Sequence, residues 1–225
     1  MLENIQGIIF DLDGTLIDSM GIWTRIDREY LAAKGFQVPE HLMDEISHLG
    51  FDAVALYFKN TFGLSDSIDI IKKTWHQMAF YHYSRDIPMK SGAVEFLGYL
   101  KRLGLKIGLA TSNSRELLEA VLRKHDIYDY FDAISITSEV ERGKNFPDVY
   151  LLSAERLGVA PEHCLVFEDI YAAVLGAKAA GMKVAGVYDI HSEHQWKDIK
   201  SLADYYVTNY VDLLEDLSYG AEKDI

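Results

Sequence analysis

Short apolar runs alternate with segments of helical periodicity along much of this chain, and this alternation constrains the fold more than any other feature. Six runs predict strands: Gly7–Phe10, Lys106–Ala110, Ala133–Thr137, Cys164–Phe167, Lys183–Val187 and Tyr205–Val207. Helical patterns fill the intervals, at Gly92–Arg102 with Ser91 as N-cap, Ser114–Lys124, Asp148–Leu157, Ala172–Ala180 and Val211–Leu217. Strands and helices that alternate at this pace predict an α/β fold, a Rossmann-like doubly wound parallel sheet with helices on both faces.

One interval breaks the alternation. Asp13 and Thr111 are 98 positions apart (111 minus 13), whereas a strand–helix–strand unit needs about 30 residues. The surplus holds helical patterns and no confident strand, at Met20–Ala33, Glu40–Ser47, Ala53–Thr61 and Ser67–Tyr83. We therefore expect a core domain of residues 1–16 and 87–225, with an all-helical domain of residues 17–86 inserted after the first strand.

Composition and charge exclude several classes of protein. The 225 residues are 49% hydrophobic and carry 22 Lys and Arg against 35 Asp and Glu, a net charge of -13. No run of Lys or Arg exceeds two residues, so a nucleic-acid-binding face is not expected. No apolar stretch approaches the ~18 residues of a membrane span, and the single cysteine makes no internal disulfide. We expect a cytoplasmic monomer without membrane or nucleic-acid partners.

Polar residues of complementary types follow four of the predicted strands. They are Asp11 and Asp13, Thr111, the loop Glu139–Lys144, and Glu168 with Asp169. Ligands of open parallel sheets bind beyond the carboxyl ends of the strands, so we expect these side chains to share one site. Two carboxylates at positions i and i+2, followed by the flexible Gly14, can point into one pocket, where one attacks phosphorus and its neighbour moves a proton. An Asp-rich turn that only caps a following helix is the plainer interpretation.

The same stretches resemble the haloacid dehalogenase superfamily, in particular its phosphatase and phosphomutase branch with a helical cap inserted after the first motif. In order along the chain, the matching stretches are Gly7–Leu16 (GIIFDLDGTL), Leu109–Asn113 (LATSN), Gly143–Asp148 (GKNFPD) and Val166–Asp169 (VFED). The resemblance implies an enzyme that works through an aspartyl phosphate. Asp11 would be the nucleophile, and Asp13 would protonate the leaving oxygen and then activate water.

A Mg²⁺ site is a further implication of the resemblance. Its protein ligands would be the Asp11 carboxylate, the Asp13 backbone carbonyl and Asp169, with Glu168 either coordinating the ion or lying beside a ligand. A hard divalent cation also answers the repulsion among carboxylates packed together. Taken alone, Glu168 and Asp169 are better explained as the acidic start of the next helix, which the helix dipole favours.

Other positions receive substrate-binding roles from the resemblance. The second motif places a phosphate-binding hydroxyl at Thr111, with Ser112 and Asn113 beside it, while Ser114 serves as a helix N-cap. Lys144 would neutralise phosphoryl oxygens, whereas neighbouring Arg142 is expected to be an ordinary surface residue. From the helical insertion and its approach, residues that would meet the leaving group are Met20, Trp23, His48, Leu49 and Phe51.

The sequence favours one reaction over its rivals. The dehalogenase branch lacks the second aspartate, so Asp13 favours phosphate chemistry. The β-phosphoglucomutase pattern has His at Trp23, Thr at Ser19 and Arg at about Ala53, and these differences favour net hydrolysis over mutase chemistry. We therefore predict a phosphatase of small phosphomonoesters, with sugar phosphates first. The alternatives are a phosphosugar mutase of the β-phosphoglucomutase type and a non-catalytic metabolite-binding regulator.

Overall fold

The structure is a computed structural model that describes residues 1–39, 42, 46 and 51–221, with side chains as far as residue 217. It divides into two compact units, a core unit of Met1–Met20 with Ile87–Ile225 and a helical unit of Gly21–Asp86. Ile17 forms β-bridges with Asp13 and Met89. Residues 17–20 therefore lie in the core unit, whereas the sequence placed them at the start of the insertion.

The core unit is built on a six-stranded sheet with the order β3-β2-β1-β4-β5-β6, in which every neighbouring pair is parallel. The strands are β1 (Gly7–Phe10), β2 (Lys106–Thr111), β3 (Ala133–Ile136), β4 (Cys164–Glu168), β5 (Lys183–Val187) and β6 (Tyr205–Val207). β1 lies in the middle, because β2 and β4 pair with its two edges. The predicted α/β fold with a doubly wound parallel sheet is confirmed.

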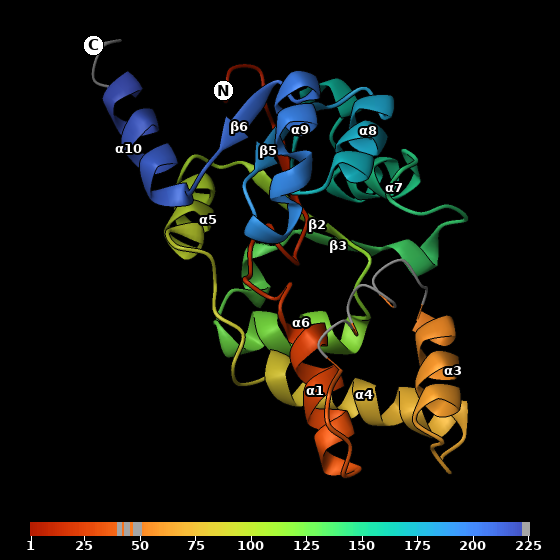
Figure 1. The fold of residues 1–225 in the computed structure, drawn as a ribbon. Coiled ribbons are helices and arrows are strands. Elements are labelled where there is room, and N and C mark those ends of the chain that lie inside the picture. The colour runs from red at the N-terminus through yellow and green to blue at the C-terminus, as the bar shows by residue number, and fades with distance from the viewer. Residues whose placement is uncertain (40–41, 43–45, 47–50, 222–225) are drawn as a thin grey trace. The chain divides into compact units, whose positions relative to one another are not determined.

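Helices cover both faces of this sheet (Figure 1). The core-unit helices are α5 (Ala93–Arg102), α6 (Arg115–Lys124), α7 (Asp148–Leu157), α8 (Tyr171–Ala179), α9 (Trp196–Leu202) and α10 (Tyr210–Ala221). Side chains alternate along the strands, so Ile9 packs with Val166 in the layer under α7, α8 and α9. On the opposite face Phe10 stacks on Phe167 with ring centroids 4.7 Å apart. Every residue of β1 is buried, as expected of a central strand covered on both sides.

The described residues of the helical unit contain the helices α1 (Ile22–Ala33), α3 (Phe51–Thr61) and α4 (Ile68–Tyr83), and no strand. Trp75 of α4 is at the centre of its core, with ring centroids 5.0 Å from Phe58 and 5.7 Å from Tyr30. Such edge-on aromatic pairs hold the three helices together. Of the predicted helix Glu40–Ser47, only Leu42 and Ile46 are described, and both are helical and buried. The other residues of this prediction, and also His48 and Leu49, lie outside the described residues.

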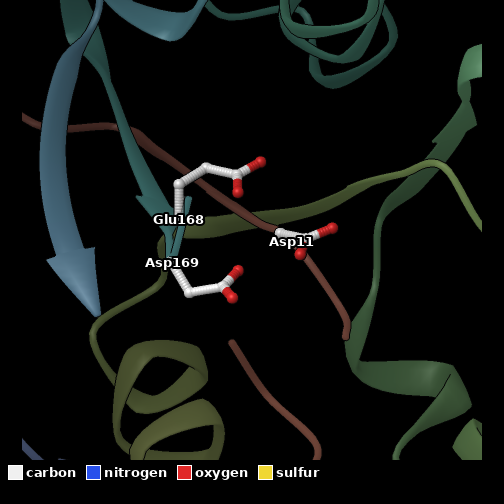
Figure 2. A group of neighbouring side chains, drawn as sticks. All are labelled: Asp11, Glu168 and Asp169. Atoms are coloured by element: carbon white, nitrogen blue, oxygen red, sulfur yellow. The ribbon is translucent and has the colours of Figure 1, made fainter. Parts of the chain in front are cut away.

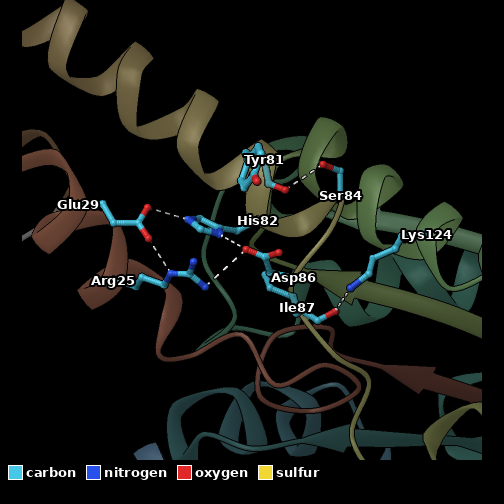
Figure 3. Close-up of polar contacts among 8 residues, drawn as sticks. All are labelled: Arg25, Glu29, Tyr81, His82, Ser84, Asp86, Ile87 and Lys124. Carbon is cyan, nitrogen blue, oxygen red and sulfur yellow. Dashed lines mark hydrogen bonds and ion pairs between the residues drawn. The ribbon is translucent and has the colours of Figure 1, made fainter. Parts of the chain in front are cut away.

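A polar network joins α1 to the C-terminal end of α4 within the helical unit (Figure 3). The ring of His82 is almost fully buried, with Nε2 at 3.1 Å from Glu29 Oε2 and Nδ1 at 2.7 Å from Asp86 Oδ2. Arg25 Nε donates to Glu29 Oε1 at 2.7 Å. The next residue, Ile87, belongs to the core unit, where its carbonyl accepts from Lys124 Nζ at 2.6 Å. Asp86, the last residue of the helical unit, is thus bonded to His82 of that unit, and Ile87 is bonded to Lys124 of the core unit.

Two local predictions need correction. We expected Ser91 as the N-cap of α5, but the N-cap is Gly92 with φ +78°. A Cβ on Gly92 would lie 2.7 Å from the backbone nitrogen of Val211, so the approach of α10 requires glycine there. The sequence also missed α9, which follows a 3₁₀ helix at Ile190–Gln195. None of the described helices is long and apolar enough to cross a membrane.

Candidate active site

Three carboxylates meet at the carboxyl end of two neighbouring strands (Figure 2). Phe10 of β1 and Phe167 of β4 are in register, and the Asp11 backbone N–H donates to the Phe167 carbonyl at 3.0 Å. The ladder therefore places Asp11 beside Glu168 and Asp169. Carboxylate oxygens from all three lie within 4.8 Å of one another, and all three side chains are buried. The sheet edge brings together what the sequence separates by more than 150 positions.

The turn after β1 fits closely against Asp169. Gly14 has φ +81°, and a Cβ there would lie 2.3 Å from Asp169 Oδ2, so both backbone conformation and space require glycine. The Thr15 hydroxyl donates to Asp169 Oδ1 at 3.1 Å. The Tyr210 hydroxyl in turn donates to the Thr15 carbonyl at 3.1 Å. The turn after β1 is thereby bonded to the first residue of α10.

Lys144 supplies a positive charge to this acidic group. Its Nζ donates to Asp11 Oδ1 at 2.6 Å and also to Glu168 Oε1, and its side chain is only 8% exposed. The Tyr150 hydroxyl donates to the same Glu168 oxygen at 2.8 Å. Burial alone would lower the pKa of Lys144, but the attraction of Asp11 and Glu168 is larger and raises it. Lys144 is therefore a charged ammonium.

Burial also shapes the titration of the carboxylates. It raises the pKa of Asp169 to about 7, with a further upward push from Glu168 and an opposing pull from Lys144. The pKa of Asp11 is raised above its usual range, first by burial, while Lys144 opposes the shift. Two carboxylate oxygens, Glu168 Oε2 and Asp169 Oδ2, are buried without a hydrogen-bond partner among the described residues. Unpartnered oxygens in a group of three carboxylates fit a hard divalent cation, which lowers such pKa values.

Asp13 is oriented from two directions. The Ser19 hydroxyl donates to its Oδ1 at 2.6 Å, and Asn113 Nδ2 donates to its Oδ2 at 2.8 Å. The Thr111 hydroxyl accepts from the Asn113 backbone N–H at 3.1 Å, which fixes the turn after β2. Ser114 is the N-cap of α6, as predicted, because its hydroxyl accepts from the Leu117 N–H at 3.3 Å.

A cavity of about 160 Å³ opens at this cluster. Its lining contains most of the predicted core-unit site residues, namely Asp11, Asp13, Met20, Thr111, Ser112, Lys144 and Asp169, together with Ile170. Glu168 and Asn113 are not part of the lining. Each instead contacts a residue that is: Glu168 accepts from Lys144, and Asn113 donates to Asp13. Trp23 belongs to the helical unit, where its ring contacts Phe51 with centroids 5.8 Å apart. The role of Trp23 in substrate binding stays a prediction.

Sequence reasoning missed three contributors to the cluster. Tyr150, Thr15 and Ser19 each donate a side-chain hydrogen bond to one of its carboxylates. Thr15 is part of the first motif and Ser19 was considered only as a difference from the mutase pattern. Tyr150 is two positions past Asp148, on a helix whose apolar pattern explains a buried aromatic without any polar role. Its hydroxyl gains significance only from the fold.

Comparison with known proteins agrees with this geometry. The family model described as haloacid dehalogenase-like hydrolase matches residues 5–181. The chain belongs to the haloacid dehalogenase-like hydrolases. Among curated relatives of this hydrolase, a phosphorylated carbohydrates phosphatase of Thermotoga maritima is 33% identical over 195 residues, 86% of this chain and 89% of that protein. Hexitol phosphatase B of Escherichia coli K12 is 31% identical over 185 residues, 80% of this chain and 82% of that protein.

Solved structures of haloacid dehalogenase-like proteins share the fold. A Thermotoga maritima protein, assigned provisionally as a β-phosphoglucomutase, superposes with a TM-score of 0.85 and 28% identity, covering 94% of this chain and 99% of that one. The resemblance seen in the four motifs is therefore confirmed at the level of family and fold. The chain is a hydrolase of this family, and the curated relatives described above are named as phosphatases.

Proposed function

We propose that this hydrolase is a Mg²⁺-dependent phosphatase that releases inorganic phosphate from small phosphomonoesters, with sugar phosphates as the leading substrate class. One observation carries the proposal: Asp11 and Asp13 both line a small cavity in which Asp11 is paired with the buried ammonium of Lys144. A nucleophilic carboxylate, a second carboxylate two residues away and a fixed cation are what phosphoryl transfer requires. The names of the curated relatives support phosphorylated carbohydrates as substrates.

In this proposal a carboxylate oxygen of Asp11 attacks phosphorus. The bond from phosphorus to the ester oxygen breaks, and Asp13 gives that oxygen a proton, so an alcohol leaves and an aspartyl phosphate remains. Asp13 then takes a proton from a water molecule that attacks the phosphorus. The Asp11–phosphorus bond breaks, inorganic phosphate leaves, and both side chains return to their starting state. Thr111 and Ser112 line the cavity where the phosphoryl oxygens would bind.

Lys144 and the metal ligands divide the neutralisation of charge. Lys144 Nζ is held by Asp11 and Glu168. From there it would face the oxygens of the transferring group. Asp11, Asp169 and the Asp13 carbonyl would hold Mg²⁺, with Glu168 beside them. The bound ion aligns phosphoryl oxygens and offsets the charge of the transition state. The unpartnered oxygens of Glu168 and Asp169 support this assignment.

Two further points concern the oligomeric state and compartment of the enzyme, and the alternative reaction. We propose that the enzyme works as a monomer in the cytoplasm. The single cysteine, Cys164, is buried and forms no disulfide, which supports a reducing compartment. A phosphosugar mutase is the second candidate, favoured by the structural match to the provisional β-phosphoglucomutase. The position of Trp23, where the mutase pattern has His, favours hydrolysis.

A panel assay tests the proposal. Purified enzyme is incubated with phosphorylated metabolites and Mg²⁺, with and without EDTA, and released phosphate is measured. We expect Mg²⁺-dependent release, suppressed by EDTA and abolished by Asp11→Asn. β-Glucose 1-phosphate is included, because isomerisation without phosphate release identifies a mutase. Multiple turnovers by Asp11→Asn, or inactivity of the unaltered enzyme toward every monoester, would contradict the proposal.

A further inference from the structure

A glycine in the middle of α8 contacts the loop that carries Lys144. Gly176 is buried, and a Cβ at this position would lie 2.0 Å from the Lys144 carbonyl oxygen and 2.8 Å from that of Phe146. Both atoms belong to the backbone, so no side chain can rotate out of the way. Because a real Cβ keeps at least 3.0 Å from such an atom, any other residue would push the loop about 1 Å away.

The backbone of Gly176 does not require glycine. It lies inside a regular helix, where glycine is less favourable than alanine by about 1 kcal/mol. The glycine is therefore explained by close approach, since α8 meets the Lys144 loop without an intervening side chain. Within the loop, the Phe146 N–H donates to the Gly143 carbonyl at 3.0 Å, which closes a turn around Lys144 and Asn145.

We propose that Gly176 is a positioning residue for Lys144. Seated against α8, the loop sets the reach of Lys144 so that its Nζ meets both Asp11 and Glu168. The helix begins two residues after Asp169, so the segment that follows the carboxylates of β4 also carries the surface on which the Lys144 loop is seated. The inference rests on the proposed function in one respect, that Lys144 acts on the phosphoryl oxygens.

The variant Gly176→Ala tests this inference, and Gly98→Ala is its matched control. Gly98 also lies inside a helix, but a Cβ there meets no atom closer than 3.6 Å. We expect Gly176→Ala to lower kcat/KM for phosphate release about 10- to 100-fold, because displacement of a catalytic group by about 1 Å costs up to about that much. Gly98→Ala should stay within about twofold of the unaltered enzyme. Unchanged kcat/KM in Gly176→Ala would overturn the proposal.

A double-variant comparison separates positioning from general damage. If Gly176 acts through Lys144, then adding Gly176→Ala to Lys144→Ala costs less than about twofold further, since the positioned group is already gone. A full additional 10- to 100-fold loss would refute the inference. Should Gly176→Ala fail to fold, Asn145→Gly/Gly176→Ala is compared with Asn145→Gly alone. The added loop freedom accommodates the methyl group, and the same loss of kcat/KM is expected.

Lysine labelling tests the inference without reference to activity. Folded proteins are treated briefly with acetic anhydride, and modification at residue 144 is measured by peptide mass spectrometry. Lys144 should be protected in the unaltered chain and in Gly98→Ala, but labelled several-fold faster in Gly176→Ala. Lys90, which pairs with Asp189 at 2.8 Å, should be unchanged in all three and reports intact folding. Equal labelling of Lys144 would refute its positioning by Gly176, whereas a lack of phosphatase activity would contradict only the proposed function.

Discussion

The Ser19 hydroxyl donates a hydrogen bond of 2.6 Å to Oδ1 of Asp13, a residue six positions earlier on the other side of the turn. With Asn113 bound to the second oxygen, both oxygens of the Asp13 carboxylate have a donor. In the proposed mechanism Asp13 moves a proton, and these two bonds fix the direction of its carboxylate.

Loss of this orientation should slow the reaction. We expect Ser19→Ala and Asn113→Ala each to lower kcat about 10-fold, and the double variant about 100-fold, because acid–base catalysis contributes about 10²- to 10⁴-fold. Ser114→Ala is the control, because Ser114 only caps α6. It should lower the free energy of unfolding by about 1 kcal/mol and leave kcat unchanged. Rates of Ser19→Ala and Asn113→Ala equal to that of the unaltered enzyme would show that Asp13 needs neither donor.

The buried cation should be indispensable. Lys144→Ala is expected to lower kcat/KM for phosphate release by more than about 100-fold, because in the proposed mechanism it removes the charge that neutralises the phosphoryl oxygens. Arg142→Ala is the control two positions earlier, since its pair with Asp148 is exposed. It should change kcat/KM less than about twofold. Steady-state phosphate release measures both variants, and a Lys144→Ala enzyme with near-normal turnover would remove Lys144 from the mechanism.

The His82 network should stabilise the helical unit. We expect His82→Phe to lower the free energy of unfolding by about 1–3 kcal/mol, because the buried His82 ring makes two hydrogen bonds that are lost, each worth about 0.5–1.5 kcal/mol, to the partly exposed carboxylates of Glu29 and Asp86. Arg25→Ala should cost clearly less than His82→Phe, since the Arg25–Glu29 ion pair is exposed and screened by solvent. Urea denaturation followed by circular dichroism compares the two variants. Equal losses of free energy of unfolding in the two variants would show that the buried hydrogen bonds of His82 stabilise the unit no more than the exposed Arg25–Glu29 pair.

The stability of the helical unit should depend on pH through the buried carboxyl of Asp27. It is 8% exposed, and burial raises its pKa to about 7, whereas an unfolded Asp titrates near 3.9. Between these values the folded chain binds a proton that the unfolded chain has lost, so this contribution to stability falls as pH rises from about 4 to about 7. Asp27→Asn should therefore stabilise the chain at pH 8 by roughly 1–4 kcal/mol and have little effect at pH 4.

Urea denaturation at both pH values checks this prediction. Asp69→Asn is the control, because Asp69 is an exposed residue in the first turn of α4. Its effect should be small and the same at both pH values. Stabilisation by Asp27→Asn that does not grow between pH 4 and pH 8 would show that the Asp27 carboxyl is not held in its neutral form.

The sheet was predictable because its strands are short apolar runs, of which the central strands β1 and β4 are buried throughout. β1 and β5 occur at the predicted residues, and β4 extends only one residue further, to Glu168. The predicted N-cap of α5, Ser91, was wrong. The N-cap is Gly92, whose need for glycine comes from the approach of Val211, a residue more than 100 positions away. Helix α9 was missed because a seven-residue segment presents too few turns for a periodic pattern.

The residues of the site divide in the same way. Asp11, Thr111 and Asp169 stand at strand ends, where position along the chain already indicates chemistry. Tyr150 and Gly176 could not be found, because the polar contact of Tyr150 and the close approach at Gly176 both come from the packing of helices against distant loops. Glu168 was expected beside a metal, but its bond to Lys144 adds a partner that no spacing predicts.

The central place of β1 has a consequence for synthesis. β1 is the first strand to leave the ribosome, yet the partner on one of its edges, β4, ends only at Glu168. Until then a nascent chain carries an apolar strand with an open edge, which is a template for pairing with other chains. Chains arrested before residue 169 should therefore aggregate or engage chaperones, and they cannot bring Asp169 to Asp11.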